Sequence, residues 1–131
     1  MGHQAIAECL KCGERFGFCL GGGFRFHLLH CDRCGRTKAI GFEQLGELHL
    51  RYLKGLGGPY CMVTAAHDEN VRTSVPVEPM TGKQYYMRVE TFAGRCWHCW
   101  GLGKYRMNAP PRCPKCRSAE YEEVAGGMMY D

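Results

Sequence analysis

The sequence lacks any apolar run long enough to span a membrane, and its first residues carry no targeting signal. The opening MGHQAIAECLKC has no basic start followed by an apolar stretch, so it does not read as a secretory signal peptide. Ile6 stands where N-myristoylation of Gly2 would need Ser or Thr. We therefore expect a cytoplasmic protein without membrane contact, whose reduced cysteines serve as metal ligands before they form disulfides.

The patterns of an enzyme active site are lacking as well. The three glycines at 21–23 are not followed by the Lys-Ser/Thr of a phosphate-binding P-loop. No nucleophile stands in a recognisable pattern with a base, and no metal-ligand pattern leaves a coordination position open. We expect a protein that is not an enzyme and has no small-molecule substrate.

Cysteine and glycine are instead abundant. The 131 residues include 10 cysteines and 18 glycines, far above average usage. Eight cysteines form four Cys-x-x-Cys turns, or knuckles, each of which can aim both sulfurs at one ion. The gaps at 13–30 and 100–112 are near those of Cys₄ zinc sites. The pattern predicts two Zn²⁺ ions, with the ligands Cys9, Cys12, Cys31, Cys34, Cys96, Cys99, Cys113 and Cys116.

The knuckles CDRCG at 31–35 and CPKC at 113–116 resemble those of zinc ribbons, over about residues 9–40 and 94–124. The chain also resembles small bacterial double-ribbon proteins of unassigned role. The resemblance implies a small metal-stabilised α+β fold with two Cys₄ ribbons of short antiparallel strands. The expected division is an N-terminal ribbon at 1–41, a helical and loop segment at 42–93, and a C-terminal ribbon with an acidic tail at 94–131.

A closed Cys₄ shell has no position for water or substrate, so both sites are expected to be structural. A rubredoxin-like iron site and a thiol redox pair are the alternatives to structural zinc. Sequential pairing of knuckles, 9/12 with 31/34 and 96/99 with 113/116, closes the shortest loops and is the arrangement we expect. A cross-braced pairing of 9/12 with 96/99 is the alternative, because loop-closure entropy grows only slowly with length.

The turn after each knuckle differs between the two halves. Gly13 and Gly35 directly follow the second cysteine of their knuckles, where a permissive backbone suits the turn. Trp100 and Arg117 occupy this place in the second half. The sequence therefore indicates a permissive turn after the first two knuckles but not after the last two.

The first unit is predicted to contain a hairpin that turns at the glycines 21–23. Apolar residues alternate over 16–20 and 24–28, which is the period of a half-buried strand. The expected inner face consists of Phe16, Phe18, Leu20, Phe24, Phe26 and Leu28. The expected outer face consists of Arg15, Cys19, Arg25, His27 and Leu29.

The middle of the chain is predicted to contain two helices and a linker. An apolar stripe over 42–56 predicts a helix packed on the first ribbon. Prolines and polar residues over 57–81 predict a loop or linker. Thr81 and Gln84 fit a capping box for a helix over 82–93, with Tyr85, Val89 and Phe92 inward, although a strand through YYMRVETF fits nearly as well.

Residues 94–118 contain six basic side chains and no acidic one, with aromatic residues between them. Phosphate attraction and base stacking are what single-stranded nucleic acid needs, so we expect contact with nucleic acid or its processing machinery. The expected contact residues are Arg95, Trp97, Trp100, Lys104, Arg106, Arg112, Lys115 and Arg117.

Two readings compete with nucleic-acid contact. The basic and aromatic groups could shield a Zn–thiolate centre instead, and the acidic stretch 120–123 could fold over them. A protein–protein adaptor that uses the 42–56 stripe or the aromatic hairpin face is the alternative function.

Overall fold

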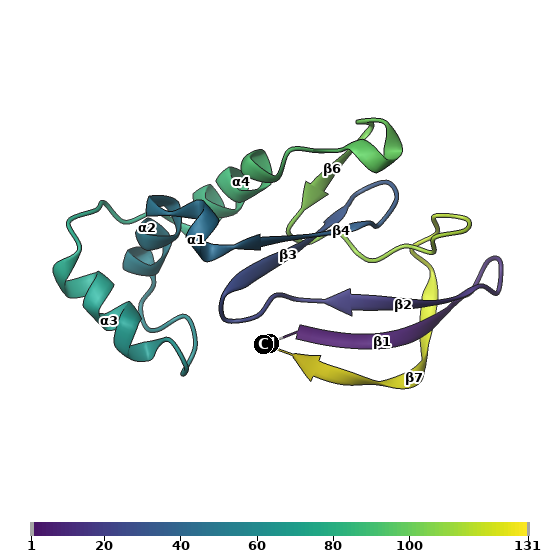
Figure 1. Cartoon of the computed structure of the whole chain (residues 1–131), viewed down its shortest axis with the longest axis horizontal. Helices are drawn as coiled ribbons and strands as arrows, with labels where there is room; N and C mark the ends of the chain where they lie inside the picture. The colour runs from purple at the N-terminus through teal and green to yellow at the C-terminus, as the bar shows by residue number, and fades with distance from the viewer. Residues whose placement is uncertain (1, 131) are drawn as a thin grey trace.

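The computed structural model describes residues 2–130 and shows a small α+β protein built on two antiparallel sheets (Figure 1). One sheet has three strands in the order β2-β1-β7, and the other has four in the order β4-β3-β6-β5. Helices α1–α3 lie at one end of the molecule, and the four Cys-x-x-Cys turns lie at the opposite end. The strands are β1 (Gly2–Cys9), β2 (Arg15–Leu20), β3 (Phe26–Cys31), β4 (Thr37–Gly41), β5 (Arg95–Cys96), β6 (Gly103–Arg106) and β7 (Tyr121–Tyr130). The helices are α1 (Phe42–Leu45), α2 (Glu47–Gly55), α3 (Ala65–Ser74), α4 (Gly82–Ala93) and the 3₁₀ turn η1 (Trp97–Cys99).

The two ends of the chain pair with each other. Strand β7 runs antiparallel to β1, with Tyr121 opposite Cys9 and Tyr130 opposite Gly2. The acidic tail is therefore an edge strand along β1, and Glu123 lies 3.2 Å from the imidazole of His3. Both sheets cross the boundaries expected from sequence, because each joins strands that lie within residues 1–41 to strands that lie within residues 94–131.

The expected hairpin between 16–20 and 24–28 is wrong. Its two strands belong to different sheets: β2 pairs with β1, and β3 pairs with β4 and β6. The glycine run crosses from one sheet to the other, and a Cβ on Gly22 would lie 2.3 Å from the carbonyl oxygen of Phe26. Glycine therefore permits a close backbone crossing here, where the sequence pattern indicated a hairpin turn.

The expected inner face of β2 is right for Phe16 and Phe18 but wrong for Leu20, which is 38% exposed, and the expected faces of β3 are wrong. Phe16 and Phe18 of β2 are buried against the inner face of β1. In β3, His27 and Leu29 are buried, although both were expected on the outer face. Strand β3 is the second strand of the four-stranded sheet, and α1, α2 and α4 pack on it. The face of β3 that these helices cover is the buried one.

The two predicted helices are present. The 42–56 stripe forms α1 and α2, which are separated at Gly46 by a left-handed backbone with φ of 56°. Helix α4 begins at the predicted capping box, where Thr81 accepts from the Gln84 backbone N–H. Tyr85 and Val89 point inward as expected, but Phe92 is 53% exposed and Ala93 takes the inward position.

Helix α3 lies inside the segment 57–81 that was predicted to be a loop. Its first turn is fixed by the carboxylate of Asp68, which accepts the backbone N–H of Tyr60 at 2.7 Å and the hydroxyl of Thr64 at 2.7 Å. Polar residues that suggest a loop in the sequence thus serve as local hydrogen-bond partners. Among the described residues, no helix has the length and apolar character that crossing a bilayer requires.

The larger core holds two buried histidines joined by one tyrosine hydroxyl. His27 Nε2 lies 2.7 Å and His49 Nδ1 lies 2.8 Å from the Tyr85 hydroxyl, which can donate to one ring while it accepts from the other. Burial lowers the pKa of each histidine from 6.5 to about 4, so both rings are neutral at pH 7. Because the unfolded rings take up protons near pH 6.5 and the folded rings only near pH 4, acidification through this range destabilises the fold.

Removing the Tyr85 hydroxyl is expected to destabilise the protein. Tyr85→Phe keeps the stacked contact with Tyr52, whose ring centroid is 4.0 Å away, but leaves two buried ring nitrogens without a partner. We expect the free energy of unfolding to fall by about 1–3 kcal/mol, measured by urea denaturation of the metal-loaded protein. Tyr86→Phe is the matched control, since Tyr86 is 42% exposed. Equal stability of the two variants would contradict the role assigned to this hydroxyl.

Candidate metal centres

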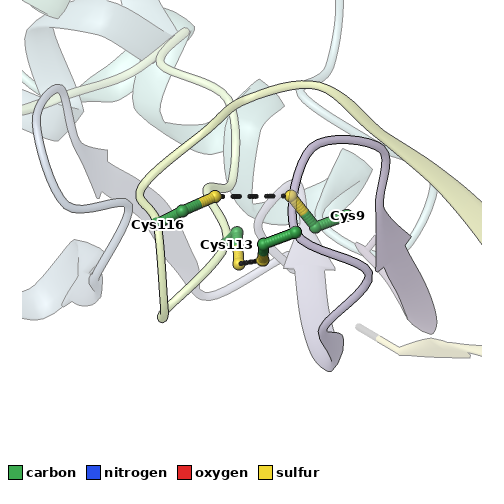
Figure 2. Close-up of side chains that lie close together, drawn as sticks. Cys9, Cys113 and Cys116 are labelled. Carbon is green, nitrogen blue, oxygen red and sulfur yellow. Dashed lines mark hydrogen bonds between the residues drawn. The ribbon is translucent and has the colours of Figure 1, made fainter.

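The eight predicted cysteines gather into two groups of four, and in each group the sulfur atoms all lie within 4.8 Å of one another. The terminal tetrad consists of Cys9, Cys12, Cys113 and Cys116, and the central tetrad consists of Cys31, Cys34, Cys96 and Cys99. All of them are free thiols. Figure 2 shows how Cys9 of the first knuckle faces Cys116 of the fourth.

The sulfur spacing fits a metal ion in both tetrads. The Sγ atoms of Cys9 and Cys116 are 3.5 Å apart, and those of Cys12 and Cys113 are also 3.5 Å apart. In the central tetrad the Sγ atoms of Cys31 and Cys99 are 3.7 Å apart, and those of Cys34 and Cys96 are also 3.7 Å apart. A tetrahedron with Zn–S bonds of about 2.3 Å has edges of about 3.8 Å. Either tetrad could therefore hold one divalent ion with little movement.

The pairing of knuckles differs from both arrangements considered from the sequence. The first knuckle joins the fourth and the second joins the third, so one loop is nested inside the other. Strand pairing explains this arrangement. Because β7 pairs with β1, the fourth knuckle, which precedes β7, lies beside the end of β1. Because β3 pairs with β6, Cys31 lies opposite Tyr105. The free energy gained from pairing these strands outweighs the small loop-closure entropy that shorter loops would save.

Three of the four knuckle backbones share one hydrogen-bond pattern. The N–H of Gly13 donates to the carbonyl of Cys9 at 3.0 Å, and Gly35 donates to Cys31 at 3.0 Å. Arg117 donates to Cys113 at 2.8 Å. The third knuckle is one residue longer, because Gly101 rather than Trp100 donates to Cys96.

All four residues that follow a knuckle adopt a left-handed backbone. Gly13 and Gly35, as expected, have φ of 77° and 75°. Trp100 and Arg117 adopt the same conformation with φ of 62° and 64°, although each carries a side chain. Such a residue costs about 1–2 kcal/mol relative to glycine. The second half of the chain thus builds the same turn at a higher energetic cost.

Each tetrad contains a thiol whose pKa is lowered, Cys9 in the terminal tetrad and Cys96 in the central one. Hydrogen bonding by the Cys12 backbone is the main cause that lowers the pKa of Cys9 from 9.0 to about 6. Burial opposes ionisation of Cys96, but hydrogen bonds from the Tyr105 side chain and the Cys99 backbone outweigh it and lower the pKa to about 6. The thiolate is the form that binds a metal, so these contacts favour loading.

The central tetrad is the more enclosed of the two. Cys31 and Cys96 are fully buried and Cys99 is 1% exposed, whereas Cys12 and Cys116 of the terminal tetrad are exposed. The backbone N–H of Gly103 donates to the Cys99 sulfur at 3.2 Å, which stabilises negative charge there. Four protein sulfurs would complete the tetrahedral shell of one bound ion in either tetrad.

The eight residues expected to contact nucleic acid separate into free and engaged groups. Trp97 is 79% exposed and Trp100 is 89% exposed. Arg106 is engaged by Asp32 at 3.5 Å and Glu90 at 3.3 Å, acids that lie far from it in sequence. The Arg112 guanidinium donates to the carbonyl of Arg117. The exposed members are Arg95, Trp97, Trp100, Lys104, Lys115 and Arg117.

The fold adds three basic residues that the sequence reading missed. Because all four knuckles lie at one end of the molecule (Figure 1), the exposed side chains of Lys11, Arg33 and Arg36 join those of the last two knuckles. Nothing in their local sequence marks them, since the knuckle pairing alone brings them there. We call this surface the knuckle end, and it comprises Lys11, Arg33, Arg36, Trp97, Trp100, Lys115 and Arg117.

Comparison with known proteins places the chain in a family. The family described as "Domain of unknown function (DUF8255)" matches residues 5–122, a range that contains all eight cysteines of the two tetrads. No curated protein matches the chain significantly. No solved structure matches it significantly either. The chain therefore belongs to the DUF8255 family.

Proposed function

We propose that this protein is a non-catalytic module, stabilised by two structural Zn²⁺ ions, that binds single-stranded nucleic acid through its knuckle end. Zinc suits four thiolates in a tetrahedral shell, and closed shells support a structural role. Ten free thiols are consistent with a reducing compartment such as the cytoplasm.

The observation that carries the proposal is the exposure of two tryptophans on one knuckle. Trp97 and Trp100 are among the most exposed large apolar residues described, at 79% and 89%. Tryptophan usually buries most of its surface, so two exposed rings three residues apart call for an explanation. Base stacking on such rings is worth about 1–3 kcal/mol per base.

Backbone strain at the knuckle end points the same way. Trp100 and Arg117 hold left-handed positions that glycine fills in the other two knuckles. The energetic cost of this backbone conformation is explained if the two side chains contact a binding partner. Both side chains are exposed to solvent. Tryptophan for stacking and arginine for phosphate are the two residue types that single strands require.

One substitution with opposite expected effects on stability and on binding tests this proposal. Trp100→Gly is expected to raise the free energy of unfolding by about 1 kcal/mol, because it relieves the left-handed backbone. The same change is expected to weaken binding of a fluorescent oligonucleotide by roughly tenfold through lost stacking. Met62→Ala is the control, since Met62 is 93% exposed but lies outside the knuckle end. Unchanged affinity in Trp100→Gly would rule out stacking on this ring.

A salt series completes this test, with fluorescence anisotropy as the readout. Affinity should fall steeply as salt rises, since bound phosphates release counterions. Arg117→Ala should make the slope of log K against log salt shallower by about 1, whereas Arg88→Ala on the exposed face of α4 should leave it unchanged. Negligible affinity at low salt for DNA and RNA alike would contradict the proposal.

A protein–protein adaptor is the second candidate, and the same exposed tryptophans favour it. The 42–56 stripe is not available for docking, because Leu45, Tyr52 and Leu53 are buried in the core. The inner residues Phe16 and Phe18 of the expected hairpin are buried too. An adaptor would therefore use Trp97 and Trp100, and its binding would show little dependence on salt.

A further inference from the structure

The two cysteine tetrads differ in how easily a reagent in solution can reach them. In the terminal tetrad, Cys12 and Cys116 are exposed, and both line an open pocket of about 520 Å³. In the central tetrad, Cys34 is half-buried and the other three cysteines are almost fully buried. Gly103 packs so closely on that tetrad that a Cβ there would lie 2.2 Å from the Cys31 sulfur. A reagent as small as hydrogen peroxide therefore reaches the terminal tetrad first.

Each sulfur pair that bridges the knuckles of the terminal tetrad combines one exposed and one buried cysteine. The Sγ of exposed Cys116 lies 3.5 Å from the Sγ of Cys9, which is 2% exposed (Figure 2). The Sγ of exposed Cys12 lies 3.5 Å from the Sγ of Cys113, which is 0% exposed. Redox-sensitive cysteines share this arrangement, in which an accessible sulfur reacts and a neighbouring sulfur then attacks it. In the central tetrad, each corresponding pair consists of buried or half-buried members.

The pocket beside the terminal tetrad carries more positive than negative charge. The charged side chains that line it are Lys11, Arg112, Arg117 and Glu120. Glu120 pairs with Lys11 at 3.9 Å, and within residues 2–130 neither arginine has a carboxylate partner. Positive charge near a sulfur favours the thiolate, which is the form that oxidants attack.

We propose that the terminal tetrad is an oxidation site, at which hydrogen peroxide converts the four thiolates to two disulfides and thereby frees the bound ion. The disulfides join Cys9 to Cys116 and Cys12 to Cys113. In each pair, the exposed thiolate attacks one peroxide oxygen, which gives a sulfenic acid and a hydroxide ion. The buried thiolate then attacks the sulfenic sulfur and expels a second hydroxide, so two electrons pass from two sulfurs to one peroxide. The sulfurs need to approach by about 1.5 Å to form the bond.

Oxidation of the terminal tetrad also regulates the knuckle end, an effect that rests on the proposed nucleic-acid binding. Three basic residues of the knuckle end, Lys11, Lys115 and Arg117, are direct neighbours in sequence of cysteines in this tetrad. The exposed tryptophans belong to the third knuckle, whose cysteines lie in the central tetrad. We therefore expect oxidation to weaken contact with phosphate and to leave base stacking in place.

Two equivalents of hydrogen peroxide, added to the full, metal-loaded chain, test the modification. Non-reducing peptide mass mapping locates the disulfides, and the dye 4-(2-pyridylazo)resorcinol measures the released ion once the peroxide is consumed. We expect one released ion per chain, the two disulfides named above and free thiols in the central tetrad, with full reversal by dithiothreitol and zinc. Equal oxidation of both tetrads, disulfides within single knuckles, or no oxidation of the terminal tetrad would overturn the proposal.

A variant pair tests whether burial protects the central tetrad. Tyr105 is 8% exposed and lies opposite Cys31 in the β3–β6 pairing, so Tyr105→Ala opens this side of the tetrad. We expect the same treatment to release the second ion from this variant. Tyr60→Ala is the matched control, because Tyr60 packs on Phe42 of α1, and it should release one ion. Continued protection in Tyr105→Ala would overturn access as the cause, and if that variant loses an ion before treatment, the contrast between the tetrads of the native chain decides.

Fluorescence anisotropy with the oligonucleotide tests the regulation separately. We expect the peroxide-treated chain to bind roughly tenfold more weakly at low salt and with a shallower slope of log K against log salt. Dithiothreitol and zinc should restore both values. Equal affinity of the oxidised and reduced chains would overturn the regulation. No binding by the reduced chain would contradict the proposed function and the regulation together, and the mapped disulfides would still decide the oxidation site.

Discussion

Replacing Cys113 by serine is expected to release one of two metal ions and to expose Cys9 and Cys12, more than a hundred residues away in sequence. The reason is that these three cysteines belong to the same tetrad, together with Cys116. A structural zinc ion contributes about 10–16 kcal/mol to the folding of a small module, so loss of one ligand removes a large share of the stabilisation. The β1–β7 pairing, which ends beside this tetrad, should loosen with it.

Cysteine alkylation followed by peptide mass mapping measures this outcome directly. In Cys113→Ser, we expect Cys9, Cys12 and Cys116 to react quickly, while the central tetrad stays protected because three of its four cysteines are almost fully buried. Cys96→Ser is the reciprocal variant and should expose Cys31 and Cys34 instead. Exposure of Cys96 and Cys99 in Cys113→Ser would support the sequential pairing expected from sequence and contradict the nested one.

Gly103→Ala is expected to abolish the central metal site, although it changes no ligand. A Cβ at this position would lie 2.2 Å from the Cys31 sulfur and 3.0 Å from the Cys99 sulfur. Neither sulfur can move away without leaving the tetrahedral position that the ion requires. The backbone N–H of Gly103 also donates to Cys99, so a shift of β6 to relieve the clash would break that hydrogen bond. We expect the variant to bind one metal ion and to unfold at a much lower denaturant concentration.

Gly57→Ala is the matched control for this change. A Cβ on Gly57 would meet no atom within 4 Å, so the same substitution should leave both metal ions and the unfolding midpoint unchanged. Metal content by plasma emission and a urea titration of both variants provide the comparison. Two ions bound to Gly103→Ala would show that the central tetrad does not hold its ion where the four sulfurs converge.

The features that were predicted correctly from the sequence are those defined by short patterns of neighbouring residues. The Cys-x-x-Cys turns are defined by four residues each, and the cap at Thr81 and Gln84 is defined by four as well. The structure contains both features where they were expected. Their geometry depends on neighbouring residues in the chain, which a single sequence displays.

Long-range pairing accounts for what the sequence did not predict. Strand β7 begins in an acidic stretch and gains its partner only from β1, so nothing local marks it as a strand. His27 became buried because Tyr85, 58 residues away, supplies its hydrogen bond. Arg106 is less available for nucleic-acid contact than expected, because it forms ion pairs with Asp32 and Glu90 in the folded chain. Each of these outcomes depends on which strands become neighbours, and periodicity does not encode that choice.

The central claim is that eight cysteine sulfurs converge on two ions, so that the terminal tetrad joins the two ends of the chain to each other and the central tetrad joins the second knuckle to the third. Native mass spectrometry of the gently purified chain tests it most directly, because the measured mass counts bound ions and also reports the state of the thiols. The account predicts the mass of the fully reduced chain plus two divalent metal ions, both of which leave together with the fold when a strong chelator is added. A folded chain without bound metal, or one whose mass is lower by two hydrogen atoms for each disulfide, would contradict it.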